Sequence, residues 1–235
     1  MSKPKEKNSL RKQFVESIQH KILSGELSVG AKLPTERQLA EELNVSRQVI
    51  NSGMDELKAA GFIKVVPRHG TYVADFRVDG NINTLNAIMD YKGEDLREEE
   101  IRSILEVRWG LEHLTIKNAI DNATDADILA LGEIVKKLGA AQSPEEAATL
   151  SFEYQMTLAT IGCNTVLPLI ISSFKAPTTI LWERFVRLYG VKTLYDNTAR
   201  AFKFIEERDY EQAVEWLNII LRETISGGHR IYRNY

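Results

Sequence analysis

The sequence predicts a mainly α protein in two parts. The N-terminal part is a winged helix-turn-helix of three helices plus a β-hairpin wing, and the C-terminal part is an antiparallel helical bundle of six to seven helices. Residues 33–73 hold a helix, a tight turn, a second helix and a two-stranded hairpin in close succession. From about Leu96 onward the apolar residues follow only helical periodicity. The 235 residues, 43% hydrophobic and 27% charged, are enough to form two domain cores.

The first two helices are predicted from apolar spacing and from a capping signal. The first should end near Gly25, and its buried face is formed by residues four apart: Leu10, Phe14, Ile18 and Ile22. The second should begin at Thr35, whose hydroxyl can accept from first-turn amides while Gln38 reaches back to complete a capping box. Its inward-facing residues are Leu39, Ala40 and Leu43.

The third helix follows the turn at residues 44–45 and has Ser46 as its N-cap. Its apolar residues recur at helical spacing and should face the core: Ile50, Met54 and Leu57. The outward face then carries Arg47, Gln48 and Asn51. These lie in the first turn and a half, where a helix-turn-helix protein presents side chains to base edges in the major groove.

The outward residues of this helix have the chemistry that base and phosphate recognition needs. Arg47 can pair with guanine or hold a phosphate, and Gln48 and Asn51 can pair with adenine. The alternative is an ordinary solvated helix face, which is the commoner explanation for any one exposed polar residue.

The segment after the third helix is predicted to be a wing. Gly61 should end the helix in the left-handed conformation, and strands at 62–66 and 71–73 should flank a turn at 67–70. Arg68 and His69 at the tip can reach a neighbouring minor groove or its phosphates. The alternative is a hairpin that only covers the core.

The segments LPTERQLAEELNVSR, GFI and HGTYVA together resemble the winged-helix domain of the GntR family of bacterial transcription regulators. The resemblance implies DNA contacts by seven residues: Thr35, Arg37, Ser46, Arg47, Gln48, His69 and Gly70. The chain departs from the family pattern at Asn51, where the family usually has Arg, and at Gly53, where it usually has Ala. In a helix interior Gly is about 1 kcal/mol less favourable than Ala.

Charge is divided unevenly along the chain. Residues 1–79 hold 13 Lys/Arg and 10 Asp/Glu, a net +3, so the remainder of this −3 chain carries −6. One mildly basic domain would bind DNA weakly, and we therefore expect a homodimer that reads two half-sites of a double-stranded operator. No apolar run reaches the roughly 18 residues of a membrane span, and the single cysteine excludes an intrachain disulfide. We expect a cytoplasmic protein without membrane contact.

The chain is predicted to divide into three segments. Residues 1–76 form the winged helix-turn-helix, residues 77–95 a linker with a short helix, and residues 96–235 the helical effector-binding and dimerisation domain. Helix breaks are expected at Asn122, Ser143-Pro144, Gly162-Asn164, Pro177, Gly190 and Asp209.

The helical part resembles the effector domain of FadR-type members of the same family, through residues 104–112, 152–164 and 204–217. In the common form of that domain an Asp and three His bind a metal. The corresponding positions here are Ser151, Gln155, Thr198 and Ile220, so we expect no metal and no cofactor. The departure favours the branch that binds acyl-coenzyme A. The effector is expected to be an acyl-CoA, a fatty acid or an organic acid.

Four residues are candidates for effector binding. Arg108 and Glu112 lie four apart on the apolar stripe of one helix, and Tyr154 and Gln155 on a facing helix can complete a site. The alternative is an ion pair that only holds helices together. The three tryptophans are expected to be core or interface residues: Trp109, Trp182 and Trp216.

These observations together predict a ligand-responsive transcription regulator. An enzyme is disfavoured because the sequence has no Gly-rich phosphate loop, GxSxG, HExxH or paired CxxC motif. The alternatives are a helical cytosolic enzyme and an adaptor whose winged helix binds protein. A regulator should show steeply salt-dependent retention on duplex DNA, and an adaptor should not.

Overall fold

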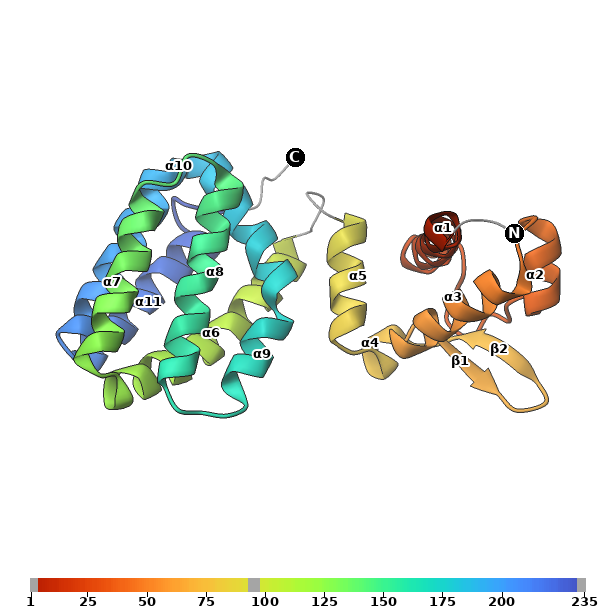
Figure 1. The fold of residues 1–235 in the computed structure, drawn as a ribbon, viewed down its shortest axis with the longest axis horizontal. Helices are drawn as coiled ribbons and strands as arrows, with labels where there is room; N and C mark the ends of the chain where they lie inside the picture. Colours follow the sequence, from red (N-terminus) through yellow and green to blue (C-terminus); the bar gives the residue numbers. More distant parts are fainter. Residues whose placement is uncertain (1–3, 93–97, 232–235) are drawn as a thin grey trace. The chain divides into compact units, whose positions relative to one another are not determined.

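The computed structural model describes residues 4–92 and 98–231, and the side chains of residues 4–8, 90–92 and 100 are not described. Within these residues it contains eleven helices and one two-stranded sheet (Figure 1). The chain divides into two compact units, residues 1–92 and 93–235. The mainly α prediction, with a winged helix-turn-helix followed by a helical bundle, is confirmed.

The first unit is built on three helices that enclose one core. They are α1 (Pro4–Leu23), α2 (Glu36–Glu42) and α3 (Arg47–Ala59). Phe14, Ile50 and Leu57 are buried at its centre, as the spacing predicts. Gly53 lies where α3 crosses α1, and a Cβ built on it would be 2.4 Å from Phe14 Cδ1. An alanine at this position would therefore collide with the Phe14 ring.

The predicted capping signals are confirmed. Thr35 and Gln38 form the capping box of α2, and the Ser46 side chain accepts a hydrogen bond from the Val49 amide at the start of α3. The turn between them places Asn44 at φ 51.

The inward position predicted for Leu43 is wrong, since its side chain is 47% exposed. It is the C-cap residue of α2, so it lies beyond the last turn whose apolar side chains face the core.

The wing is an antiparallel pair formed by β1 (Ile63–Val66) and β2 (Gly70–Val73). The register pairs Ile63 with Val73 and Val66 with Gly70. Helix α3 ends at Ala59 with Ala60 as its C-cap, and Gly61 follows in the predicted left-handed conformation with φ +71. Lys32 forms an isolated bridge with Tyr72 and so extends the hairpin on its outer side.

Two helices occupy most of the stretch predicted as linker. They are α4 (Phe76–Asp79) and α5 (Ile82–Lys92). The Asn81 side-chain amide donates to the Ala59 carbonyl, and the Thr84 hydroxyl donates to the Ala60 carbonyl at the end of α3. These bonds attach α5 to the first unit. The remaining predicted linker residues 93–95, and residues 96–97, lie outside the described part of the chain.

The second unit is an α-helical bundle (Figure 1). Its helices are α6 (Glu98–Asn122), α7 (Asp125–Gly139), α8 (Pro144–Ile161), α9 (Leu167–Ser173), α10 (Lys175–Glu206) and α11 (Tyr210–Ile225). Helix α8 packs against α6, α7 and α10, and α11 packs against α6 and α10. The breaks predicted at residues 122, 143–144, 162–164 and 209 coincide with helix ends.

Two predicted breaks fall inside α10 and have different outcomes. Gly190 interrupts it with φ 82 and ψ 159, a conformation that favours glycine. Pro177 does not break it. It lies in the first turn of the helix, where backbone amides have no intrahelical hydrogen-bond acceptor. The lack of an amide proton in proline therefore costs no helical hydrogen bond.

No helix in the described ranges 4–92 and 98–231 is long and apolar enough to cross a membrane.

Candidate functional site

The exposed face at the start of α3 is presented by a buried face on the same helix. Val49 and Ile50 are buried, 5% and 0% exposed, and this fixes the rotation of the helix on the core. Arg47, Gln48 and Asn51 are consequently exposed. The Ser46 oxygen accepts the Val49 amide proton, so its hydroxyl proton stays available for an acceptor such as a phosphate oxygen.

Helix α2 contributes two of the residues implied by the resemblance. The Thr35 hydroxyl accepts from the Gln38 amide at 3.3 Å and donates to the Gln38 side-chain oxygen at 2.8 Å. Both of these bonds belong to the helix cap. Arg37 is exposed, and its Nε lies 3.8 Å from a Glu41 carboxylate oxygen. A surface pair of this kind is weak and can exchange for a phosphate contact.

The wing tip presents Arg68 and His69 to solvent. Arg68 has φ 64 within the turn, and His69 Nδ1 lies 2.9 Å from the Pro67 carbonyl oxygen. Because a carbonyl can only accept, Nδ1 carries the proton and Nε2 remains as the second polar atom of the ring. Gly70 has φ 120, and a Cβ there would be 2.9 Å from Lys32 Cε.

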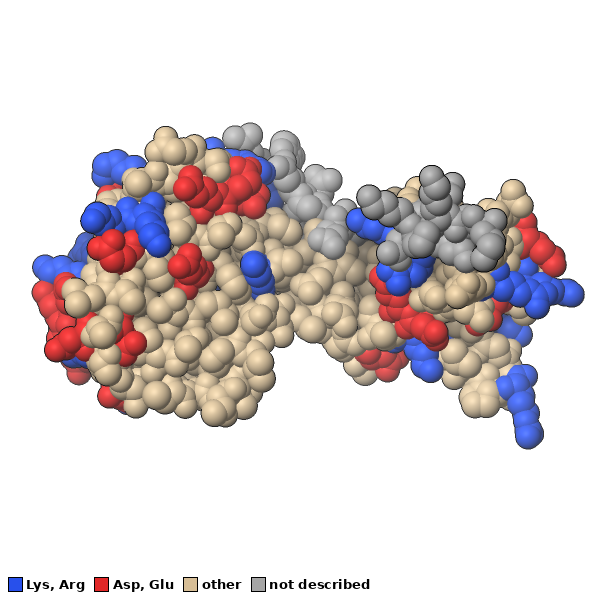
Figure 2. All heavy atoms as spheres, viewed as in Figure 1, with Lys and Arg blue, Asp and Glu red and all other residues tan. Residues whose placement is uncertain are grey.

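Lys32 is a basic residue of this surface that sequence reasoning missed. Its ammonium lies 5.9 Å from the centre of the Tyr72 ring, beside the wing. It lies directly before the segment 33–73 that carries the motif, and the bridge to Tyr72 places it at the wing. Figure 2 shows blue side chains over α2 and at the end of the wing.

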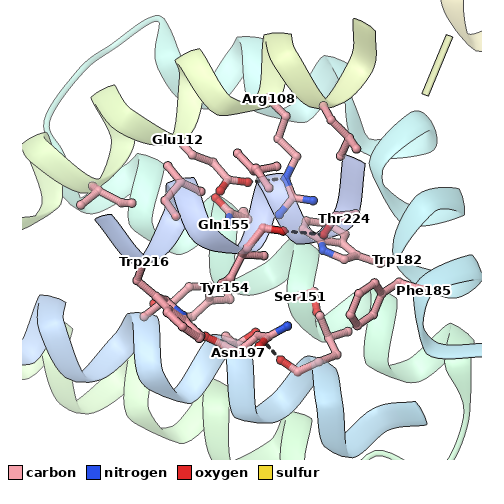
Figure 3. Close-up of a pocket in the computed structure, with 18 of the residues that line it drawn as sticks. Arg108, Glu112, Ser151, Tyr154, Gln155, Trp182, Phe185, Asn197, Trp216 and Thr224 are labelled. Atoms are coloured by element: carbon pink, nitrogen blue, oxygen red, sulfur yellow. Dashed lines mark hydrogen bonds and ion pairs between the residues drawn. The ribbon is translucent and has the colours of Figure 1, made fainter. Parts of the chain in front are cut away.

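A cavity of about 100 Å³ lies inside the second unit, between α6, α8, α10 and α11. All four predicted effector residues, Arg108, Glu112, Tyr154 and Gln155, line it (Figure 3). Sequence reasoning did not assign its other polar and aromatic walls to an effector site: Ser151, Trp182, Phe185, Asn197, Thr198, Trp216 and Thr224. Because Gly190 divides α10, residues on both halves of this helix reach the cavity.

The charged part of the cavity is an ion pair. Arg108 Nε donates to Glu112 Oε1, and Glu112 is only 4% exposed. The guanidinium carbon also lies 4.5 Å from the centre of the Trp182 ring. Figure 3 shows the two side chains and Gln155 close together on one side of the cavity. The Arg108–Glu112 ion pair, which was the alternative to an effector site, is therefore present, and both of its residues line the cavity.

Two hydroxyls in the cavity wall are buried without a hydrogen-bond partner among the described residues. They are Ser151 Oγ and Tyr154 Oη. Burial, and secondarily the negative charge of Glu112, raise the pKa of Tyr154 well above its usual value, so the phenol stays protonated. Leaving such groups unsatisfied typically costs about 1–3 kcal/mol each, and a ligand that bonds them recovers that cost.

The positions that correspond to the metal ligands of related domains also lie at this cavity. Ser151, Gln155, Thr198 and Ile220 all line it, as the alignment of motifs implies. These residues do not fit a transition-metal site because none supplies an imidazole or a carboxylate. The three tryptophans were expected to be core or interface residues, but Trp182 and Trp216 also line the cavity. Trp109 is 45% exposed, and its indole N–H donates to the Asn218 side-chain oxygen.

Comparison with known families matches each unit separately. The family described as bacterial regulatory proteins, gntR family, matches residues 10–73, and the FCD domain family matches residues 103–223. The HTH-type transcriptional regulator LutR of Bacillus subtilis (strain 168) is 26% identical over 200 residues, 82% of this chain and 89% of the relative. The fatty acid metabolism regulator protein of Shewanella halifaxensis (strain HAW-EB4) is 26% identical over 172 residues, 73% and 69% of the two chains.

Among solved structures, Lar, which controls the expression of the Listeria monocytogenes agr system, has a similar fold. The TM-score is 0.63 at 14% identity, with 99% of each chain covered. At this identity the likeness concerns the fold alone.

Proposed function

The chain belongs to the GntR family of bacterial transcription regulators and carries an FCD domain, and we propose that it binds an operator as a homodimer under the control of a small organic acid. The family and the matched relatives are regulators rather than enzymes. The observation that carries the proposal is the combination of an exposed, capped recognition helix in one unit with a polar cavity in the other.

Operator recognition is proposed for the α3 face and the wing. Arg47, Gln48 and Asn51 read base edges, with Arg68 and His69 placed on a neighbouring groove or its phosphates. Ser46, Thr35 and Arg37 contact phosphates, and Gly70 keeps the wing backbone close to Lys32. Asn51 is shorter than the Arg usual in the family, so the operator sequence should differ from those of relatives.

The contact assignment is tested with the double variant Arg47→Ala, His69→Ala. Both side chains are exposed, so the variant should stay folded while losing most of its affinity for a duplex selected from a random pool. Losing the positive charge of Arg47 next to the DNA in both protomers should also flatten the dependence of log K on log salt by roughly 2. Binding is measured by fluorescence anisotropy at several salt concentrations.

The matched control is Arg102→Ala, which removes an exposed charge from α6 in the other unit. It should bind the duplex as the wild type does. Full affinity in the double variant would contradict the assignment of these two residues.

The proposed dimer surface is an apolar stripe on α6 and α9. It is formed by Val107, Gly110 and Leu114 on α6, with Leu169 and Ile170 on α9 and Val166, the N-cap residue of α9. The α6 residues are spaced three and four apart, the two helices pack side by side, and nothing lies within 4 Å of a Cβ placed on Gly110. Figure 2 shows the surface over α9 without charged side chains. Exposed apolar side chains on two helices that pack together are typical of a subunit interface.

The cavity size favours a small organic acid over an acyl-CoA or a fatty acid as the effector. An engineered cavity of about 150 Å³ accommodates benzene, so a cavity of about 100 Å³ suits a molecule of a few carbon atoms. A long acyl chain would require the four helices to separate. The name of the Shewanella relative refers to fatty acid metabolism. The size of the cavity is the reason that a fatty-acid effector is not proposed for this chain.

We propose that the effector acts by shifting the populations of arrangements of the two DNA-binding units in the dimer. This requires the ligand to prefer one arrangement, and operator affinity must then change by the same coupling factor as ligand affinity. A ligand that stabilises the protein in a thermal-shift assay is therefore expected to change affinity for the selected duplex. Unchanged duplex affinity at saturating ligand would contradict this mechanism.

A further inference from the structure

The charge of the effector cavity is balanced by the protein itself. Among the described residues that line it, Arg108 and Glu112 are the only charged ones, and they pair with each other. The remaining polar lining consists of hydroxyls and amides. The lining is therefore neutral overall before any ligand enters.

A simple carboxylate anion fits this balance poorly. The charge of Arg108 is already compensated, and an added anion would share the cavity with the Glu112 carboxylate, which is 4% exposed. Interior charges repel strongly because water does not screen them. Arg108 can bind an anionic group of a ligand. The cavity then stays free of excess negative charge only if the same ligand carries a positive group that binds Glu112.

The lining can satisfy both ends of such a ligand. The ion pair with Glu112 uses Nε of Arg108, so its two terminal guanidinium nitrogens can serve a ligand, and the hydroxyls of Ser151 and Tyr154 have no hydrogen-bond partner among the described residues. These groups can donate to a carboxylate. The second carboxylate oxygen of Glu112 and the side-chain oxygen of Gln155 can accept from an ammonium group. Figure 3 shows Glu112 and Gln155 adjacent.

We infer that the effector is a small zwitterion, a molecule of the α-amino-acid class, rather than a carboxylate anion. This rests on the proposed function, since it names the ligand of the same cavity. The carboxylate binds Arg108, Ser151 and Tyr154, and the ammonium binds Glu112 and Gln155. The apolar walls, which include Trp182, receive a short side chain.

The inference is tested with pairs of molecules that differ only in an ammonium or hydroxyl group on the α carbon. The pairs are L-alanine and L-lactate, L-serine and L-glycerate, L-valine and its 2-hydroxy analogue, and L-aspartate and L-malate. Binding to the full-length protein is measured by thermal shift and isothermal titration calorimetry. We expect at least one amino acid to bind, about tenfold or more tightly than its hydroxy analogue.

The variant Glu112→Gln should reverse this preference. It keeps a side-chain oxygen for Arg108 but leaves the cavity with a net positive charge, so affinity for the amino acid falls about tenfold and affinity for the hydroxy acid rises. Glu106→Gln, on the exposed side of α6, is the matched control and should keep the wild-type preference. If Glu112→Gln does not fold, Tyr154→Phe provides the second variant and should weaken amino-acid binding in a folded protein.

The outcomes separate the inference from the proposed function. Three results would overturn the inference. Every hydroxy acid binds more tightly than its amino acid, or no member of any pair binds, or a folded Glu112→Gln variant keeps the wild-type preference. If a hydroxy acid binds and alters duplex affinity, the proposed function stands without the inference. If an amino acid binds but leaves duplex affinity unchanged, the inference stands and the proposed control of DNA binding does not.

Discussion

At the scale of single residues, the cavity wall combines one satisfied charge pair with unsatisfied hydroxyls. Arg108 and Glu112 compensate each other, whereas Ser151 and Tyr154 have no partner among the described residues. A protein selected for stability alone gains from replacing such hydroxyls with hydrogen or a methyl group. In the proposed function, a bound ligand supplies their hydrogen-bond partner.

Tyr154→Phe should raise the free energy of unfolding by about 1 kcal/mol at pH 8 without ligand, because it removes an unsatisfied buried hydroxyl. The pKa of Tyr154 is raised by burial, so the unfolded chain releases this proton above pH about 10 while the native protein retains it. Native protein then holds more protons, and wild-type stability falls as pH rises. The advantage of the variant should widen between pH 9 and 11.

The measurement is denaturant unfolding followed by tryptophan fluorescence, since all three tryptophans lie in the second unit. Tyr210→Phe, at a side chain 38% exposed, is the control and should show no such widening. A variant less stable than the wild type across this pH range would show that the hydroxyl has a partner.

At the scale of elements, helix caps and glycines determine how the parts fit. The Thr35 and Ser46 caps start α2 and α3 at the residues that the sequence predicts, so the register of the exposed recognition face follows from local signals. Gly53 is the exception, because its role depends on a residue from another helix. Phe14 on α1 fills the space where a methyl group would lie.

Gly53→Ala should destabilise the first unit although Ala favours the helix by about 1 kcal/mol, since overpacking against Phe14 costs about 1–3 kcal/mol. In the Phe14→Leu background the same substitution should become neutral or stabilising. The first unit contains no tryptophan, so the measurement is native-state hydrogen exchange of α1 and α3 amides. Additive effects of the two substitutions would mean that the residues do not compete for space.

At the scale of the whole molecule, the charge distribution and the apolar stripe both favour a dimer. The net +3 of residues 1–79 is small for one DNA-binding unit, and two copies double the phosphate contacts. The stripe on α6 and α9 provides a surface by which two copies can associate. Operator affinity should therefore depend on this stripe, although none of its residues contacts DNA in the proposal.

Leu114→Glu should convert the dimer to a monomer, because it places a charge within the stripe, and should lower duplex affinity by about tenfold or more. Leu129→Glu is the matched control, since Leu129 is 73% exposed on α7, away from the stripe. Mass is measured by light scattering after size-exclusion chromatography. A Leu114→Glu protein that remains dimeric would exclude the stripe as the interface.

The sequence by itself determined the elements whose signals are local. The capping box at Thr35, the cap at Ser46, the glycine at 61 and most helix ends of the bundle were predictable because each depends on neighbours a few residues away. Arg108 and Glu112 were predictable as a pair for the same reason, being one helical turn apart. Leu43 was predicted incorrectly because its exposure depends on where α2 ends.

Only the tertiary structure decided which distant residues share a site. Ser151 and Trp182 meet Arg108 at one cavity because α6, α8 and α10 pack around it, and no periodicity within a helix encodes that meeting. Lys32 likewise reaches the wing only through its bridge to Tyr72. Local hydrogen bonds act between neighbours in sequence, whereas a cavity forms from side chains that packing brings together, so the sequence indicated the regulator and the structure indicated which residues line its cavity.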